Sequence, residues 1–283
     1  MKKTINSRSL LKRKNPYTNL AIGAALILLL ILVALFADVL APYAVDDADL
    51  DNRFAAPSAQ HWFGTDNYGR DVFSRVLYGS RIALHVAALS VSIQLVLGVT
   101  IGLLSGFYSG WVDRVLCFVM DVTWALPPII MAFAVISIIG KTLDNAIIAI
   151  AVVCWASYAR IVRAKTMSLK NTAFVETAVA FGENRFAIMF RYILPNIVSS
   201  IVVIASMSIP GAIMSTTALS YLGLGAQSPS PDWGLALSES MNYLTRAPWL
   251  GIYPGIALVL TTFGFMMLGE GVRDILDPHM QTA

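Results

Sequence analysis

The stretch ETAVAFGENRFAIMFRYILPN, residues 176–196, separates two long apolar segments at about 145–164 and 197–221. Its charged side chains, its central Gly182 and its late Pro195 are typical of a pair of helices in water rather than of one helix surrounded by lipid. The role of this insert depends on whether the segments around it lie in water or in a membrane. The composition of the whole chain indicates which.

That composition indicates a membrane protein. Apolar residues make up 57% of the 283 residues and charged residues 13%, about half of the roughly 25% usual in soluble domains. A soluble domain of this length could not bury so much apolar surface, because the buried fraction grows slowly with chain length. The bilayer must therefore solvate the excess. Cys117 and Cys154 both lie in apolar stretches and indicate no disulfide framework.

Apolar segments long enough to cross a bilayer recur along the chain. A hydrocarbon core of about 30 Å requires roughly 20 apolar residues in a helix. Six segments meet this requirement: 20–40, 82–105, 115–139, 145–164, 197–221 and 251–270. Backbone amides in lipid need partners within their own segment, which favours helices, and the absence of two-residue alternation excludes a barrel. We therefore expect an all-α integral membrane protein with six transmembrane helices.

The charges between the spans predict an orientation. The arm 1–19 carries no acid, and its charged residues are Lys2, Lys3, Arg8, Lys12, Arg13 and Lys14. Such an arm stays in the cytoplasm. With six spans, 106–114, 165–196 and the tail 271–283 are then cytoplasmic as well. The acid-rich segments 41–81 and 222–250 are outside. The arm and the first span could also form a signal peptide, but the apolar core is too long, so we expect an uncleaved anchor.

Small residues and prolines mark the spans. Gly98, Gly102 and Gly106 recur every four residues, which places them on one helix face and lets a neighbouring helix approach closely. Proline kinks a helix, and it occurs at Pro127-Pro128, Pro210 and Pro254. Kinks of this kind suit either a moving pathway or ordinary membrane helices.

Few polar side chains lie within the spans. They are His85, Gln94 and Asp121. An ionisable group at membrane depth is costly and faces the bundle interior or water, so we expect Asp121 to pair with Arg160 or Arg163. We expect His85, near the outer end of its span, to be hydrated.

Several catalytic motifs are missing. The chain has no phosphate-binding loop, no zinc-protease motif and no nucleophile elbow. Its three histidines, His61, His85 and His279, are too scattered for an obvious metal site. We predict no catalytic residue and no bound metal, so energy for uphill transport would come from a partner or an ion gradient.

The insert itself predicts two helices joined by a glycine. Helix-favouring residues run from Arg163 to Phe181, Gly182 interrupts them, and a second helix is expected over about 184–192. Pro195 suits the first turn of the following span. Lys170 and Arg185 are possible neighbours of Glu176. The aromatic side chains of such a helix could lie on lipid or in a groove of a partner.

At this point the sequence resembles a known family. The pattern E-T-A-x-x-x-G followed by I-L-P-N closely resembles the EAA loop of permease subunits of bacterial ABC importers. Glu176, Ala178, Gly182 and Pro195 fall on the motif positions, and Thr177 replaces the usual alanine. The resemblance implies a coupling helix, including Arg185, that docks on a separate ATPase subunit. ATP and Mg²⁺ would then bind to partner subunits, with no cofactor on this chain.

Three further stretches are similar to one group within that family. They are HWFGTDNYGRDVFSR at 61–75, SYLGLGAQSPSPDWG at 220–234 and GEGVRDILDP at 269–278. They resemble the "C" subunit of dipeptide, oligopeptide and nickel permeases. This implies a type I ABC importer permease fold in a bacterial inner membrane, with one span and an outer loop before a five-helix core, 82–270. It also implies a homologous second permease, two ATPase subunits and an extracytoplasmic solute-binding protein, with peptide favoured over nickel or a metal chelate as solute.

The outer-loop motifs also have a structural interpretation. The residues Gly64, Thr65, Asp66, Gly69, Arg70 and Asp71 follow a turn-then-helix pattern. Asp66 is the expected helix cap, and the motif would seat the loop against the bundle. Trp233 lies in a glycine- and proline-rich loop that either receives a binding protein or caps the pathway.

Two other classes remain open at the level of sequence. A free-standing carrier usually shows repeats and polar, broken helices near the bilayer midplane, which are not evident here. A membrane scaffold whose insert binds a partner other than an ATPase is the second alternative.

Overall fold

The computed structural model describes residues 16–276, so most of the basic arm and the tail from Asp277 lie outside the described residues. The described part is helical apart from its loops and one isolated bridge between Thr65 and Asp71. The long helices are α1 (Pro16–Leu35), α3 (Val72–Tyr108), α6 (Leu143–Lys170), α9 (Leu194–Tyr221) and α11 (Trp249–Leu276). The shorter ones are α2 (Ala37–Leu40), α4 (Gly110–Thr123), α5 (Pro128–Ile139), α7 (Ala173–Ala180), α8 (Arg185–Ala187) and α10 (Trp233–Ser240).

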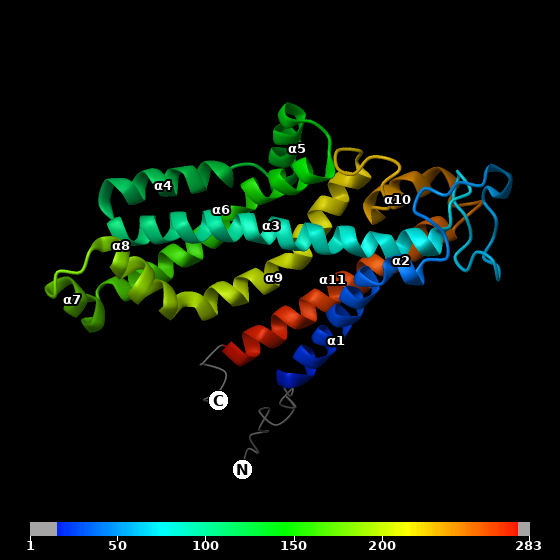
Figure 1. Ribbon diagram of the computed structural model, residues 1–283. Coiled ribbons are helices and arrows are strands. Elements are labelled where there is room, and N and C mark those ends of the chain that lie inside the picture. Colours follow the sequence, from blue (N-terminus) through cyan, green and yellow to red (C-terminus); the bar gives the residue numbers. More distant parts are fainter. Residues whose placement is uncertain (1–15, 277–283) are drawn as a thin grey trace, which may run out of the picture.

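The helices form an elongated bundle (Figure 1). α3 packs along α6, and α1 packs along α11, with α9 in contact with α3, α6 and α11. The two short helices α7 and α8 lie at one end of the bundle, and α10 lies at the other end beside the loop that precedes α3. These are called the α7 end and the α10 end below.

Five helical runs of the described chain are long and apolar enough to cross a membrane, and a bent pair, α4 and α5, makes a sixth. The predicted third span, 115–139, contains two helices, α4 and α5, that meet at 90°, so the kink expected at Pro127-Pro128 is a sharp break. The reason is local. Pro128 disfavours helical backbone in the residue before it, and Pro127 is extended with ψ 134°.

Other boundaries also differ from those predicted. α3 begins at Val72 rather than near residue 82, and its 37 residues correspond to about 55 Å, more than the hydrocarbon core requires. The helix expected over 163–181 is broken, since α6 ends at Lys170 and α7 begins at Ala173. The helix expected over 184–192 is instead continuous with α9, through a π-helical turn at Ile188–Ile193.

The glycine stripe of α3 faces α6. A Cβ added at Gly98 would lie 2.3 Å from Tyr158 Cβ, and one at Gly102 would lie 2.6 Å from the Ala159 carbonyl oxygen. One at Gly106 would lie 2.6 Å from Thr166 Cβ. Since no Cβ fits at these distances, the glycines set the separation of the two helices.

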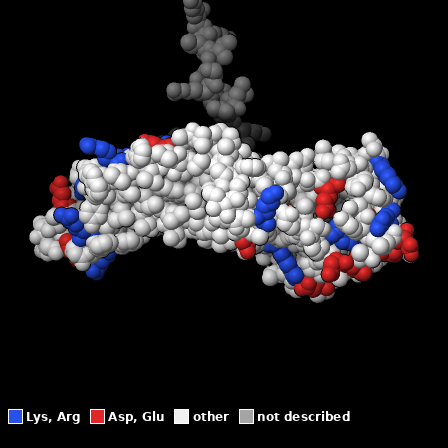
Figure 2. Space-filling model, turned by 90° about the horizontal axis from the view of Figure 1, so that it is seen from above, with Lys and Arg blue, Asp and Glu red and all other residues white. Residues whose placement is uncertain are grey.

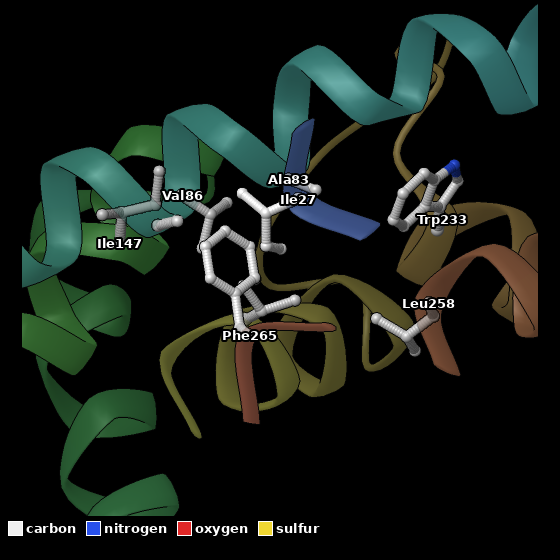
Figure 3. Close-up of a cluster of buried hydrophobic side chains, with 9 residues drawn as sticks. Ile27, Ala83, Val86, Ile147, Trp233, Leu258 and Phe265 are labelled. Carbon is white, nitrogen blue, oxygen red and sulfur yellow. The ribbon is translucent and has the colours of Figure 1, made fainter. Parts of the chain in front are cut away.

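The main core contains side chains from six helices, α1, α3, α6, α9, α10 and α11, and Figure 3 shows most of them. Phe265 of α11 points toward Ile27 of α1, Val86 of α3 and Ile147 of α6. Trp233 of α10 closes this cluster on the side of the α10 end. The core therefore ties the first and last helices to the centre of the bundle.

Charged side chains gather toward the two ends of the molecule. Figure 2 shows Lys, Arg, Asp and Glu at both ends of one face, with an uncharged stretch between them. Such a distribution suits a bundle whose middle lies in hydrocarbon.

The glycine contact leads to a direct prediction. We expect Gly102→Ala to lower the free energy of unfolding by about 1–3 kcal/mol, because the added methyl group overpacks the α3–α6 contact. Gly211→Ala on α9 is the matched control, since its Cβ would meet nothing within 4 Å. Thermal unfolding of the purified chains in detergent measures both, and equal melting temperatures would contradict the assigned role of the stripe.

Candidate functional site

The segment from α7 to α9 is held on the bundle by one apolar face. Val175 and Ala178 of α7 are buried and pack in a cluster with Leu103 of α3 and Val162 of α6. The buried residues Ile188, Met189, Ile193 and Ile197 complete this cluster. The segment is therefore a fixed part of the fold rather than a free loop.

The same segment also carries large apolar side chains that are exposed. Together we call them the exposed aromatic surface: Phe174, Val179, Phe181, Phe186 and Phe190. Phe181 is 84% exposed and Phe186 63%. Several large exposed apolar side chains within one short segment indicate a site of contact with a partner or a membrane.

Gly182 forms the joint between α7 and α8. Its φ of +78° lies in the left-handed region, and a Cβ there would meet nothing within 4 Å. The amide of Gly182 donates to the Val179 carbonyl and that of Glu183 to the Ala178 carbonyl, which together form a Schellman cap. Glycine is thus needed here for its backbone conformation and not for space.

The remaining motif residues have separate surroundings. Thr177 Oγ1 donates to the Ala173 carbonyl at 2.7 Å, and the Arg185 guanidinium lies over the Tyr108 ring at 5.6 Å. Within residues 16–276, Glu176 forms no ion pair with its expected neighbours. Lys170 instead donates to Ser109 Oγ at 2.8 Å. Glu176 is exposed beside the aromatic surface.

Pro195 lies in the first turn of α9, as predicted, although the chain before it is already helical. Proline has no N–H to continue the ladder. A π-helical turn, Ile188–Ile193, directly precedes α9. The Asn196 side chain Nδ2 donates to the Tyr192 carbonyl of this turn at 2.6 Å.

An ion pair that the sequence analysis missed fixes the helices next to this segment. The Arg163 guanidinium of α6 donates to both carboxylate oxygens of Asp113 on α4, at 2.6 and 2.7 Å. Ser105 of α3 donates to the same carboxylate at 2.5 Å. The sequence does contain an indication of this ion pair, because Asp113 is an acidic residue in the first turn after Ser109-Gly110. Arg163, however, was expected only as a partner of Asp121.

The two ionisable groups predicted within spans both have partners. Asp121 accepts from Arg160 Nη2 at 2.8 Å, which confirms one of the two partners expected for it. His85 Nε2 lies 2.8 Å from Asp144 Oδ1, and both side chains are exposed.

At the α10 end, the turn before α3 has a different cap from the one predicted. Asp71, not Asp66, is the N-cap of α3 and accepts from the Ser74 amide at 2.7 Å. Asp66 instead accepts from the amides of Tyr68 and Arg70 and from Arg70 Nε at 2.6 Å. The carboxylate of Asp66 is thus used within the turn, so the expectation that it caps a helix is wrong.

The glycines and threonine of this motif close the same turn. Gly64 and Gly69 have φ values of +73° and +77°, and a Cβ at Gly69 would lie 1.7 Å from the Asp49 carbonyl oxygen. Thr65 Oγ1 donates to the Asn52 carbonyl at 2.5 Å, and the Thr65 carbonyl accepts from Trp249 Nε1 at 3.2 Å. The motif therefore holds the loop against α11.

Arg75 joins the two loops at the α10 end. Its guanidinium donates to the carbonyls of Val45, Pro229 and Ser230, at 3.1, 3.1 and 2.8 Å. Trp233 is buried and donates to the Val76 carbonyl at 3.1 Å. Trp233 is thus part of the junction and is not exposed to a partner.

Acidic groups near this junction are shifted by burial. Burial raises the pKa of Asp232, which caps α10, and also raises the pKa of Glu239. Glu239 lies 3.5 Å from Arg70 Nη2. Each raised pKa means that the charged form is more costly in the folded chain than in the unfolded one.

The described residues contain no group of three or more potential metal ligands. The predicted site residues lie in three places: the coupling segment at the α7 end, the glycine contact between α3 and α6, and the junction of the outer loops with Trp233 at the α10 end.

Comparison with known proteins identifies the class of this fold. Residues 98–282 match the family "binding-protein-dependent transport system inner membrane component", and residues 20–57 match the "N-terminal TM domain of oligopeptide transport permease C". The fold is also similar to a chain in the inward-facing MetNI methionine ABC transporter, with a TM-score of 0.59 and 17% identity over 71% of this chain and 96% of that one.

Similar proteins of known name cover nearly the whole chain. A dipeptide transport system permease protein, DppC, of Alkalihalophilus pseudofirmus is 41% identical over 92% of this chain and 86% of its own. Glutathione transport system permease proteins, GsiD, are 43% identical in Pectobacterium atrosepticum and 44% in Escherichia coli, each over 93% of this chain and 88% of their own. The chain belongs to the family of binding-protein-dependent transport system inner membrane components, the permease subunits of ABC importers.

Proposed function

We propose that this chain forms half of the translocation pathway of an ATP-driven importer for dipeptides and oligopeptides. A homologous second permease would supply the other half. Two ATPase subunits would bind ATP and Mg²⁺, and an extracytoplasmic binding protein would deliver the solute. The observation that carries the proposal is the exposed aromatic surface, held rigidly at the end of a bundle of membrane-spanning helices.

The rigid mounting of this surface supports a role in coupling. α7 is fixed to α3 and α6 through Val175 and Ala178, and its other face is free to dock on a partner. A shift of α7 would therefore move the spanning helices with it. In this proposal, closure of the ATPases acts on Glu176, Phe181 and their neighbours and is passed into the bundle.

Charge supports the orientation. Basic side chains dominate near the α7 end, where Lys165, Lys170, Arg185 and Arg191 lie on or beside the coupling segment. The loop before α3 carries Asp46, Asp47, Asp49 and Asp51. Basic loops remain in the cytoplasm, so the proposed orientation has the α7 end and both termini on the cytoplasmic side of a bacterial inner membrane.

The relatives support peptide as the solute. A dipeptide permease and glutathione permeases are similar over nearly the entire chain. Glutathione is itself a tripeptide, so both names describe short peptides. Import of nickel or a metal chelate by the same mechanism is the alternative, and a free-standing carrier is a more distant one.

Transport in liposomes tests the solute and the energy source. We expect the complete complex with its binding protein to take up a labelled dipeptide only when ATP is present on the ATPase side. The chain reconstituted alone should take up none. Uptake of nickel but not of dipeptide would favour the metal alternative, and uptake by the isolated chain would reject ATP-driven coupling.

Exposed aromatic residues provide a test of docking. We expect Phe181→Ala to reduce ATPase association about tenfold, which corresponds to roughly 1.4 kcal/mol. The stability of the chain should change by less than about 0.5 kcal/mol, because Phe181 is 84% exposed. Ile138→Ala on α5 is the control, at 86% exposure. Co-purification of the ATPases measures the effect, and equal recovery with both variants counts against docking at α7.

Gly182 provides a matched pair for the geometry of the joint. Valine at φ +78° is strained by about 1–2 kcal/mol, whereas asparagine tolerates this region better. We expect Gly182→Val to reduce ATP-dependent uptake and Gly182→Asn to retain most of it. Gly223→Val is the control at the α10 end, with a φ of +73° and nothing near its Cβ. Co-purification of the ATPases is measured for both valine variants. If it falls as much in Gly223→Val as in Gly182→Val, the coupling role fails.

A further inference from the structure

A cavity of about 660 Å³ lies between α6, α9 and α11 near the α7 end. Its polar lining includes Lys165 from α6, Ser199 and Ser200 from α9, and Arg273 from α11. The comparisons with relatives and the proposed coupling role leave this cavity unexplained, because no residue of the exposed aromatic surface lines it.

The cavity carries positive charge without compensation from its own walls. Lys165 and Arg273 line it, and no Asp or Glu does. Among residues 16–276, neither cation forms an ion pair. Two acidic residues lie near Arg273 in the sequence of α11, Glu270 before it and Asp274 after it. Glu270 accepts a hydrogen bond from Asn19, and neither acid lines the cavity. An anionic group would therefore be attracted to it.

The polarity of the cavity changes along the helices. Ile161 lies one turn from Lys165 toward the middle of α6, and Ile204 lies one turn from Ser200 toward the middle of α9. The basic and hydroxyl side chains lie within about two turns of the helix ends, with apolar lining residues on both sides of them: Leu169, Ile197 and Leu276 toward the ends, and Ile161, Val203 and Ile204 toward the middle of the spans. The apolar wall on the side of the span middles suits the tail of an amphiphile whose anionic head lies at the basic groups.

We propose that the cavity binds an anionic phospholipid. Lys165 and Arg273 would hold the phosphate of the headgroup, with hydroxyl contacts from Ser199 and Ser200, and an acyl chain would lie along Ile161 and Ile204. Basic pockets between transmembrane helices are suited to anionic headgroups, which concentrate in the cytoplasmic leaflet. A soluble anion would use the two cations but would leave the apolar wall without a partner.

Lipid titration of the full-length chain tests this site. Purified protein is titrated with phosphatidylglycerol or phosphatidylcholine in a neutral detergent, and bound lipid is counted by native mass spectrometry together with the melting temperature. We expect phosphatidylglycerol to bind the unaltered chain more tightly than phosphatidylcholine. Lys165→Gln with Arg273→Gln should reduce phosphatidylglycerol affinity about tenfold or more and leave phosphatidylcholine affinity unchanged.

A control with the same loss of charge separates the site from general attraction. Arg53→Gln with Lys141→Gln removes two exposed basic side chains outside the cavity, and this variant should retain the preference for phosphatidylglycerol. Equal affinity losses in the two double variants would overturn the proposal, as would an unchanged preference in Lys165→Gln with Arg273→Gln.

Soluble anions form the second arm of the experiment. Inorganic phosphate and a dipeptide are each titrated into the unaltered chain and into Lys165→Gln with Arg273→Gln. Stabilisation by either one, lost in the variant and not matched by phosphatidylglycerol, would assign the cavity to a soluble anion and reject the lipid. The readout is binding to the isolated chain, so the result is independent of whether the complex imports peptides.

Discussion

The close contact between α3 and α6 is the constraint on which the bundle depends. In hydrocarbon, no hydrophobic effect drives two helices together, so dispersion contacts and backbone proximity must do so. Gly98, Gly102 and Gly106 allow this approach, and each meets α6 at a distance that no Cβ could occupy. α6 in turn carries Arg163, which binds Asp113 of α4. The position of α4, and of the segment that follows α6, is therefore set by this one helix pair.

Hydrogen bonds hold the loops and helix caps at the two ends of the bundle, where water can hydrate the polar groups that have no partner in the protein. At the α10 end, Arg75 joins loops that are far apart in sequence through the carbonyls of Val45, Pro229 and Ser230. At the α7 end, the Schellman cap at Gly182 turns the chain so that α7 buries Val175 and exposes Phe181. The bundle thus has a closed junction at one end and an apolar contact surface at the other.

This asymmetry connects the fold to transport. A permease subunit that draws energy from a partner needs a surface that the partner can hold and a rigid connection from that surface to its spans. The exposed aromatic surface and the apolar cluster beneath α7 have these two properties. The bent α4–α5 pair, by contrast, packs mainly on α3 and α6.

Much of the fold could be predicted from the sequence because its signals are local. Apolar runs of membrane length predicted the spans, Gly98, Gly102 and Gly106 were predicted to lie on one packing face, and the motif around Gly182 predicted a joint between two helices. The pairing of Asp121 with a basic residue of the fourth span was also predicted. Each of these depends on residues within a few turns of one another or on the cost of charge in hydrocarbon.

Tertiary structure decided the rest. Pro127-Pro128 predicted a kink, but the 90° angle of the break also depends on the packing of α4 on α3 and α6 and of α5 on α6 and α9. The N-cap of α3 is Asp71, the residue directly before Val72, and the predicted cap Asp66 instead binds Arg70 within the turn. Three further features involve residues from separate helices: the ion pair of Asp113 with Arg163, the burial of Trp233, and the cavity beside Lys165. By itself the sequence determined which segments enter the membrane, since hydrophobicity is a property of each segment. Only the tertiary structure decided which polar side chains meet, because those distances depend on how the helices pack.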